Sequence, residues 1–251
     1  MYFMITQKGP TDMNAKPEVI VFTPTPNEFA AVKRQVEAGV YHNFTPRVVE
    51  SGPGKINATF KMASEVLPLT ASGRRPAFVL GSGTSGSLSL ELTAGDLIAS
   101  SACLISDWRM EDDDCRHSGV YGQFVYHPVT TEKAKEMTIA CDDPIVEKLM
   151  VRLTGKGFIR GRMLTSDTFV AGRNNKLSLG RDFDCLTCDM ESGAFAFTAQ
   201  HLLGGIPWFN LRVVADTLDE SLHDYFNKEI DMVEILGTKT AQALTALDEL
   251  M

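Results

Sequence analysis

The sequence has no run of lysine and arginine and no apolar stretch long enough to cross a bilayer. Acidic residues outnumber basic ones by 32 to 24, and the formal charge of −8 argues against a nucleic-acid-binding protein, because such proteins carry a basic face. Residues 1–16 are apolar only at their tip and show no secretory segment before a cleavage site. We therefore expect a cytoplasmic protein with a small-molecule ligand, without nucleic-acid or membrane partners.

Cysteine is also scarce. Five residues form an odd and scattered set, and a chain of this length does not need disulfides, so reduced thiols are expected. Cys185 and Cys188 have a spacing typical of redox or zinc sites, but a thioredoxin-like context and a second ligand pair are both missing. They are interpreted as two small buried residues in a strand. The adjacent acids 111–114 cannot all face one ion and are interpreted as a solvated loop in an irregular stretch, 107–127. No metal site is expected.

The hydrophobic content of 44% is enough for one substantial core, so we expect a single domain over residues 18–251 after a polar leader over residues 1–17. Short apolar runs, such as 19–22, alternate with amphipathic stretches. The last of these stretches predicts a helix over about 228–250. This alternation favours a mixed α/β layer fold.

Carboxylates stand at the ends of apolar segments. Asp189 and Glu191 follow a short apolar stretch and precede a helix rich in Ala and Phe, and Asp216 ends the run that begins at Trp208. Strand interiors in an α/β sheet are buried, whereas the carboxyl ends open into the crevice where ligands bind. Each acid alone could stabilise a helix N-terminus or cap a turn. The three together favour a ligand site.

Two further features lie near strand ends. Glu28 is expected in the first turn of a helix that follows strand 19–22, and by itself it is typical of a surface residue stabilised by the helix dipole. Residues 81–88 contain three glycines with serine and threonine, a composition that lets the backbone approach an anion or a sugar. Their spacing matches neither the Walker motif nor the dinucleotide fingerprint.

The chain resembles the purine nucleoside phosphorylase and nucleosidase family over roughly residues 18–250. The motifs that carry this resemblance are Ser51-Gly52-Pro53-Gly54-Lys55-Ile56-Asn57-Ala58, Gly83-Thr84-Ser85-Gly86-Ser87-Leu88, Ser166-Asp167-Thr168-Phe169, Asp189-Met190-Glu191-Ser192 and Val213-Val214-Ala215-Asp216. The resemblance implies a three-layer αβα fold with a central mixed twisted sheet. Within the family the chain looks most similar to the 5′-methylthioadenosine/S-adenosylhomocysteine nucleosidases, which hydrolyse the N-glycosidic bond of adenine.

The resemblance also implies catalytic roles. Asp216 would be the general acid that protonates N7 of adenine, and Glu28 would activate the attacking water. Glu191 would hold the ribose hydroxyls, and its charge would favour the positive charge that develops on the sugar. A carboxylic acid donates a proton near neutral pH only when its surroundings favour the protonated form, so Asp216 is expected to be protonated or to share a proton when substrate binds.

Other positions are implied to bind substrate by the same match. Phe169 would stack on the base, the backbone of Val170 would read the adenine edge, Met190 would pack against the sugar, and Thr84 would lie near the nucleophile. The remaining substrate-binding positions are Gly86, Asp189 and Phe226. A homodimer is implied, because the pocket for the 5′ substituent borrows residues from a neighbouring subunit in this family. No cofactor is implied.

Two alternatives stay open. Phosphorylases of the family hold phosphate with arginines, one of them where this chain has Gly81, so water is favoured as the nucleophile unless Arg34, Arg47 or Arg109 folds back to the site. The other alternative is a nucleoside-binding protein without catalysis. Retention of all three acids argues against it, because binding alone has little need for an acid and a water-activating base.

Overall fold

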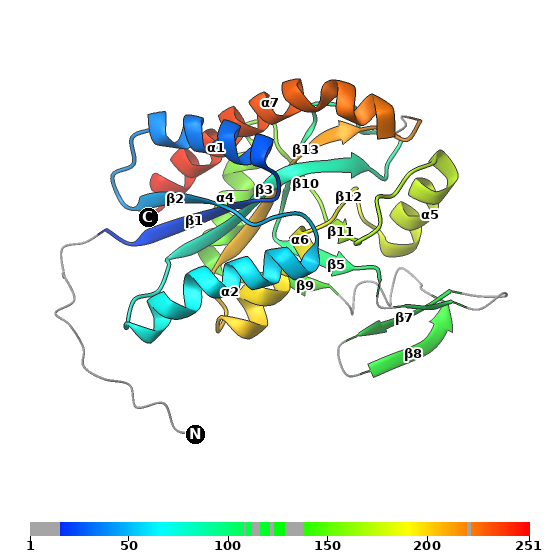
Figure 1. Cartoon of the computed structure of the whole chain (residues 1–251), viewed down its shortest axis with the longest axis horizontal. Coiled ribbons are helices and arrows are strands. Elements are labelled where there is room, and N and C mark those ends of the chain that lie inside the picture. The colour runs from blue at the N-terminus through cyan, green and yellow to red at the C-terminus, as the bar shows by residue number, and fades with distance from the viewer. Residues whose placement is uncertain (1–15, 108, 112–115, 121–122, 129–137, 220–221) are drawn as a thin grey trace.

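The structure, a computed structural model, describes residues 16–107, 109–111, 116–120, 123–128, 138–219 and 222–251, with side chains described in 16–107, 138–219 and 230–251. Within these residues a ten-stranded mixed sheet lies between two layers of helices (Figure 1). The three-layer αβα fold is therefore confirmed. The predicted leader, apart from residues 16 and 17, lies outside the described residues.

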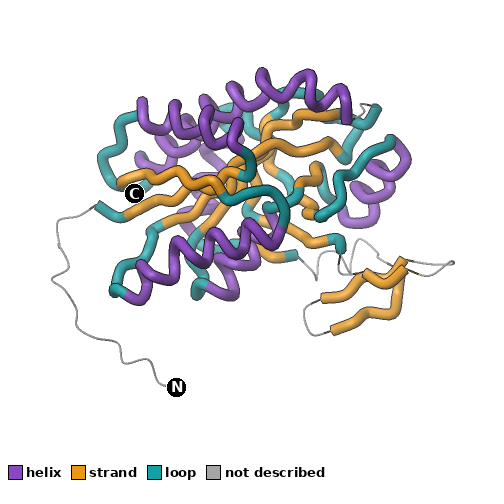
Figure 2. Tube along the Cα trace, viewed as in Figure 1, coloured by secondary structure: helices purple, strands orange, loops and turns teal. Residues whose placement is uncertain are grey.

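Figure 2 shows how strands and helices alternate along the chain. The strands of the large sheet are β1 (Glu18–Thr23), β2 (Thr45–Glu50), β3 (Phe78–Ser87), β4 (Leu97–Ser100), β5 (Ala102–Ile105), β9 (Ile139–Ala140), β10 (Ile159–Arg160), β11 (Met163–Thr165), β12 (Thr187–Asp189) and β13 (Trp208–Asp216). The helices are α1 (Pro26–Ala38), α2 (Lys55–Ala71), α4 (Pro144–Thr154), α5 (Arg173–Phe183), α6 (Ser192–Phe197), the π-helical turn η1 (Thr198–Leu202) and α7 (Leu222–Asp248).

Strand β3 is the centre of the sheet. It pairs in parallel with β1 and β13, and its last residues pair antiparallel with β12. Strand β13 also pairs antiparallel with β4, while β11 pairs in parallel with β12 and β5. The sheet is therefore mixed. Strands β1, β3 and β13 run in one direction, so their carboxyl ends lie at one edge, where ligands of α/β sheets bind. Strands β11 and β12 run the other way, and the carboxyl end of β12 reaches the last residues of β3, where Cys188 pairs with Gly86.

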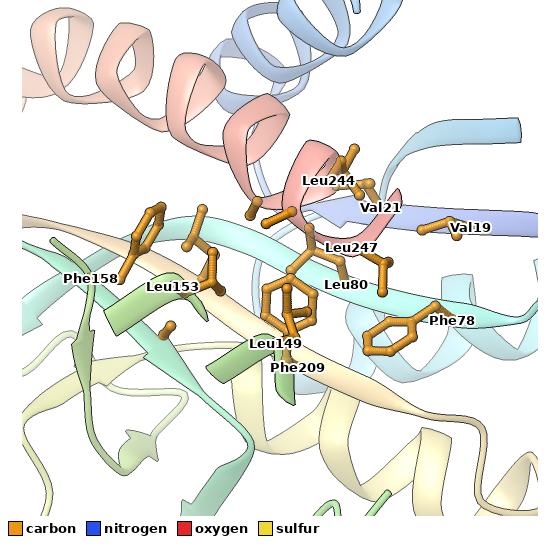
Figure 3. Packing of buried hydrophobic residues seen from close by; sticks show 14 of the residues in the cluster. Val19, Val21, Phe78, Leu80, Leu149, Leu153, Phe158, Phe209, Leu244 and Leu247 are labelled. Atoms are coloured by element: carbon orange, nitrogen blue, oxygen red, sulfur yellow. The ribbon is translucent and has the colours of Figure 1, made fainter. Parts of the chain in front are cut away.

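Both faces of the sheet are covered, which explains why its strands are apolar without alternation. Val19 and Val21 of β1 pack into one hydrophobic cluster with α1, α4 and α7, part of which Figure 3 shows. Ile20 and Phe22, which point to the other face, pack into a second cluster with α2 and α6. The period of two along a strand therefore divides one apolar run between two cores.

Two predicted segments differ from the structure. The stretch expected to be irregular contains three antiparallel strands, β6 (Arg109–Glu111), β7 (Arg116–Val120) and β8 (Gln123–Pro128). The sequence of β7 lacks the apolar alternation on which strand prediction depends. Of the predicted acidic loop 111–114, only Glu111 is among the described residues. The last helix begins at Leu222, earlier than predicted.

The helices are unlike membrane spans. In the part of the chain that the structure describes, no helix is both long and apolar enough to cross a bilayer.

Candidate active site

A cavity opens between the last residues of β3, β12 and β13 and the loops that follow β1 and β11. It brings together nine of the residues predicted to form the site: Glu28, Thr84, Gly86, Phe169, Val170, Asp189, Met190, Glu191 and Asp216. Pro24, Thr25, Pro53, Ser85, Leu88, Thr168, Lys176 and Cys188 complete the lining. Phe226 lies in α7, and its side chain is outside the described side chains. The structure thus gathers these residues in one cavity, while their individual roles stay predictions.

Glu28 is held at the start of α1 by a capping box. The backbone N–H and the hydroxyl of Thr25 each donate to Oε2 of Glu28 at 3.0 Å, and the Glu28 N–H donates to Thr25 Oγ1 at 3.3 Å. The backbone N–H and the hydroxyl of Thr84 donate to the other oxygen, Oε1, at 2.7 and 3.0 Å. Only 2% of Glu28 is exposed. It is therefore a buried carboxylate facing the Gly-rich strand β3, and the alternative of an exposed surface residue is wrong.

Burial raises the pKa of Glu28, and the hydrogen bonds from Thr84 and the charge of Arg212 act against that rise. A carboxylate with a raised pKa is a better proton acceptor than an exposed one. Glu28 has the properties that a general base needs.

Arg212 is a charged residue in the middle of β13, a strand whose nine residues are all buried. Its Nε donates to Oδ2 of Asp189 at 2.6 Å, and its Nη2 lies 3.9 Å from Oε2 of Glu191. Asp189 also accepts hydrogen bonds from Thr165 and from the backbone N–H groups of Glu191 and Ser192. The oxygens of Asp189 are therefore engaged by protein groups, and its contact with substrate stays a prediction.

Glu191 follows β12 and is only 4% exposed. Its Oε1 accepts a hydrogen bond from the backbone N–H of Gly54 at 2.8 Å, so the loop before α2 closes over this side chain. Burial and, after it, the charge of Asp189 raise the pKa of Glu191 to about 8, against the lowering effect of Arg212. In the free protein this pKa favours the protonated form of Glu191 at neutral pH.

Glu191 should make stability depend on pH. Its pKa is higher in the folded state, about 8, than in the unfolded state, 4.5, so its contribution to stability is complete below pH 4.5 and is lost as the pH rises through 8. We expect Glu191→Gln to gain stability relative to the wild type by on the order of 4 kcal/mol between pH 4.5 and pH 9. Urea unfolding of both proteins at these two pH values measures this gain.

The control for this experiment is Glu147→Gln. Glu147 is an exposed carboxylate whose pKa is lowered by its hydrogen bond with Arg160, so its replacement should give no gain at high pH. If the wild type and Glu191→Gln lose stability in parallel between pH 4.5 and 9, Glu191 is not protonated in the folded protein at neutral pH.

Asp216 is the last residue of β13 and is 2% exposed. Its Oδ2 forms an ion pair with the ammonium group of Lys176 from α5. The carboxylate lies directly over Gly86, where a Cβ atom would be 2.9 Å from each of its oxygens. A residue larger than glycine at position 86 would therefore displace the carboxylate.

A second ionic cluster holds two loops beside the cavity. The ammonium of Lys55 contacts Asp107 and lies 2.8 Å from Asp167, and the backbone N–H of Lys55 donates to Asp167 at 2.9 Å. Ser166 donates to Asp107 at 2.8 Å. This cluster ties the loop that carries Gly54 to the loop that carries Phe169, and both loops border the cavity.

The sequence did not predict Lys176 or Arg212 as site residues, although each has a signal. Arg212 interrupts a buried apolar strand, where a charge requires a partner. Lys176 stands at helical spacing with Leu179, Gly180 and Phe183, which form the buried face of α5.

The arginines that could have bound phosphate lie elsewhere or are not described. Arg34 pairs with Glu234, and Arg47 pairs with Glu18 and Glu65. The side chain of Arg109 is outside the described residues. At position 81 a Cβ atom would lie 2.0 Å from Oδ1 of Asn210, so no side chain fits there without displacing Asn210.

None of the four cysteines that the structure describes is exposed. Cys103, Cys185 and Cys188 are buried and Cys141 is half-buried, all as free thiols, and Cys115 is outside the described residues. Burial raises the pKa of Cys185 to about 12, so its thiol is not reactive. Cys188 is in β12, but Cys185 precedes that strand, so the prediction of two strand residues is wrong for Cys185.

In the described residues, no group of three or more His, Cys, Asp or Glu side chains could hold a metal ion.

Comparison with known proteins gives a consistent result. Residues 17–248 match the profile of the Phosphorylase superfamily. The chain is 24% identical over 209 residues to a 5′-methylthioadenosine/S-adenosylhomocysteine nucleosidase of Exiguobacterium sp., with 82% of each protein covered. It is 26% identical over 214 residues to an aminodeoxyfutalosine nucleosidase of Helicobacter pylori, with 84% of each covered. The crystal structure of the 5′-methylthioadenosine/S-adenosylhomocysteine nucleosidase of Helicobacter pylori matches with a TM-score of 0.73 at 19% identity, over 95% of this chain and 100% of that one.

Proposed function

This chain belongs to the phosphorylase superfamily, and from that premise we propose that it hydrolyses the N-glycosidic bond of an adenine nucleoside of the 5′-methylthioadenosine/S-adenosylhomocysteine type. Both relatives compared above are named nucleosidases, which supports hydrolysis of this bond. The observation that carries the proposal is that three buried carboxyl groups, those of Glu28, Glu191 and Asp216, line a single cavity in different surroundings.

The base departs with the help of Asp216. A purine anion is a poor leaving group, so its N7 takes a proton from the Asp216 carboxyl group as the bond between C1′ and N9 breaks and its electrons pass to the base. Phe169 and Val170 line the same cavity and supply an apolar surface for the base.

The sugar becomes positively charged as the bond breaks. The side chain of Glu191, which the backbone N–H of Gly54 orients, faces the ribose hydroxyls. Glu191 gives its proton to solvent when substrate binds, stabilises the charge on the sugar as a carboxylate, and takes a proton back when the products leave. Glu28, which Thr25 and Thr84 hold from two sides, accepts a proton from the water that attacks C1′. The products are the free base and the free sugar.

Water is preferred over phosphate as the nucleophile because the described cations of the site are already paired. Lys176 is bound to Asp216 and Arg212 to Asp189, so neither is a free anchor for a dianion. Homodimer formation and a cytoplasmic location stay predictions of the resemblance and the composition.

The proposal is tested by the products. The protein is incubated with methylthioadenosine, S-adenosylhomocysteine, adenosine and inosine, with and without phosphate, and the base and sugar products are identified. We expect release of adenine and a free sugar at a rate that phosphate does not change. A sugar 1-phosphate would establish the phosphorylase alternative, and no release from any nucleoside would favour a binding protein without catalysis.

A further inference from the structure

Lys176 lies on the buried face of α5, where an apolar side chain would be expected. It shares the buried face of α5 with Leu179, Gly180 and Phe183, and its side chain is only 1% exposed. A buried ammonium group is costly unless a charged partner compensates it, and a leucine or methionine would fill this position at lower cost. The presence of a lysine at this buried position is therefore explained by its charge and not by packing.

The charge of Lys176 is directed to one carboxyl group. Its Nζ contacts Oδ2 of Asp216 and donates a hydrogen bond to the carbonyl oxygen of Thr217 at 2.7 Å. These two contacts aim the ammonium group at the end of β13, in the wall of the cavity. The ion pair joins residues 40 positions apart in the sequence.

The other titratable and charged groups of this cavity come from different elements. Glu28 belongs to α1, Cys188 and Asp189 belong to β12, and Glu191 belongs to the turn after it. Arg212 of β13 lies behind this lining, against Asp189. Arg212 is bound to Asp189, and Glu28 is bound to Thr25 and Thr84. Among the ion pairs of the described residues, the partner of Asp216 is Lys176.

We propose that Lys176 is the positioning residue of the acid step: its ammonium group orients the Asp216 carboxyl group and stabilises the carboxylate that forms when Asp216 gives its proton to the departing base. This inference rests on the function proposed above. Asp216 acts on the base, and Lys176 acts through Asp216.

When substrate binds, Asp216 takes up a proton from solvent, and its ion pair with Lys176 becomes a hydrogen bond. N7 of the purine then gains this proton while the electrons of the bond between C1′ and N9 pass to the base. The attacking water gives a proton to Glu28, and Glu28 releases it to solvent before the next turnover, so each turnover takes up one proton at Asp216 and releases one at Glu28. An ammonium group binds a carboxylate more strongly than a neutral carboxylic acid. The contribution of Lys176 therefore grows as the proton leaves, which accelerates the step rather than only binding the substrate.

The test separates catalysis from binding. Lys176→Met and Lys176→Gln remove the charge, and Gln keeps a side-chain donor for Asp216 in case the Met variant does not fold. For each variant, kcat is measured with methylthioadenosine, and Kd is measured with its 7-deaza analogue, which lacks the nitrogen that accepts the proton. We expect kcat to fall by about 10- to 100-fold while Kd for the analogue changes by less than about 3-fold.

Two further variants serve as controls. Arg181→Gln removes a charge from an exposed position of the same helix and should leave kcat unchanged. Lys176→Arg keeps the charge and should retain more of kcat than either neutral variant. The inference is overturned if the neutral variants keep kcat within about 3-fold of the wild type, or if kcat and analogue binding are lost together in a folded Gln variant. A wild-type protein that releases no base from any nucleoside would instead refute the proposed function.

Discussion

Asp216→Asn is expected to lower the rate of adenine release by about 1,000-fold, the largest effect predicted for this protein. Asparagine has nearly the same shape as aspartate but cannot donate the proton that N7 requires. Its side-chain oxygen still accepts a hydrogen bond from Lys176, and it still fits over Gly86. Binding should therefore persist, and Kd for methylthioadenosine should remain measurable by calorimetry.

The same substitution should reduce stability, because it leaves the ammonium of Lys176 buried without an opposite charge. Removing one partner of a buried ion pair costs about 3 to 5 kcal/mol. The double variant Asp216→Asn with Lys176→Met removes both charges and should recover much of this loss in a urea titration, without recovering activity. Full activity of Asp216→Asn would exclude Asp216 from the mechanism.

Glu28→Gln is expected to lower kcat by roughly 100- to 1,000-fold, with a smaller effect on substrate binding. Glutamine cannot accept a proton from the attacking water. Its amide would also turn one N–H group toward the donors of either Thr25 or Thr84, because all four of the hydrogen bonds at this side chain point toward its oxygens. Steady-state kinetics with methylthioadenosine, together with Kd for the 7-deaza analogue, measures both effects.

Thr25→Ala is the matched control for Glu28. It removes the hydroxyl that caps α1 and should cost about 1 kcal/mol of stability, but it leaves the carboxylate of Glu28 in the cavity. If Thr25→Ala lowered kcat as much as Glu28→Gln does, the effect of Glu28 would come from the helix cap and not from proton transfer.

The positions of the acids along the chain were predictable because they depend on local rules. Asp216 ends a buried strand, Glu191 follows β12 just before a helix, and Glu28 lies in the first turn of α1, as expected. Strand and helix ends follow from the period of apolar residues and from capping chemistry, both of which act over a few residues. The strand β7 was missed because its sequence lacks that periodicity.

The sequence by itself determined the alternation of strands and helices, the acidic and apolar character of the chain, and the end of an element at which each catalytic candidate stands. Only the tertiary structure decided which distant residue each of these groups contacts. Glu191 meets the N–H of Gly54 across 137 positions, Glu28 meets Thr84 across 56, and Lys176 meets Asp216 across 40. Such pairs form because the order of strands in the sheet brings distant loops to one edge, and burial there makes every unpaired charge costly.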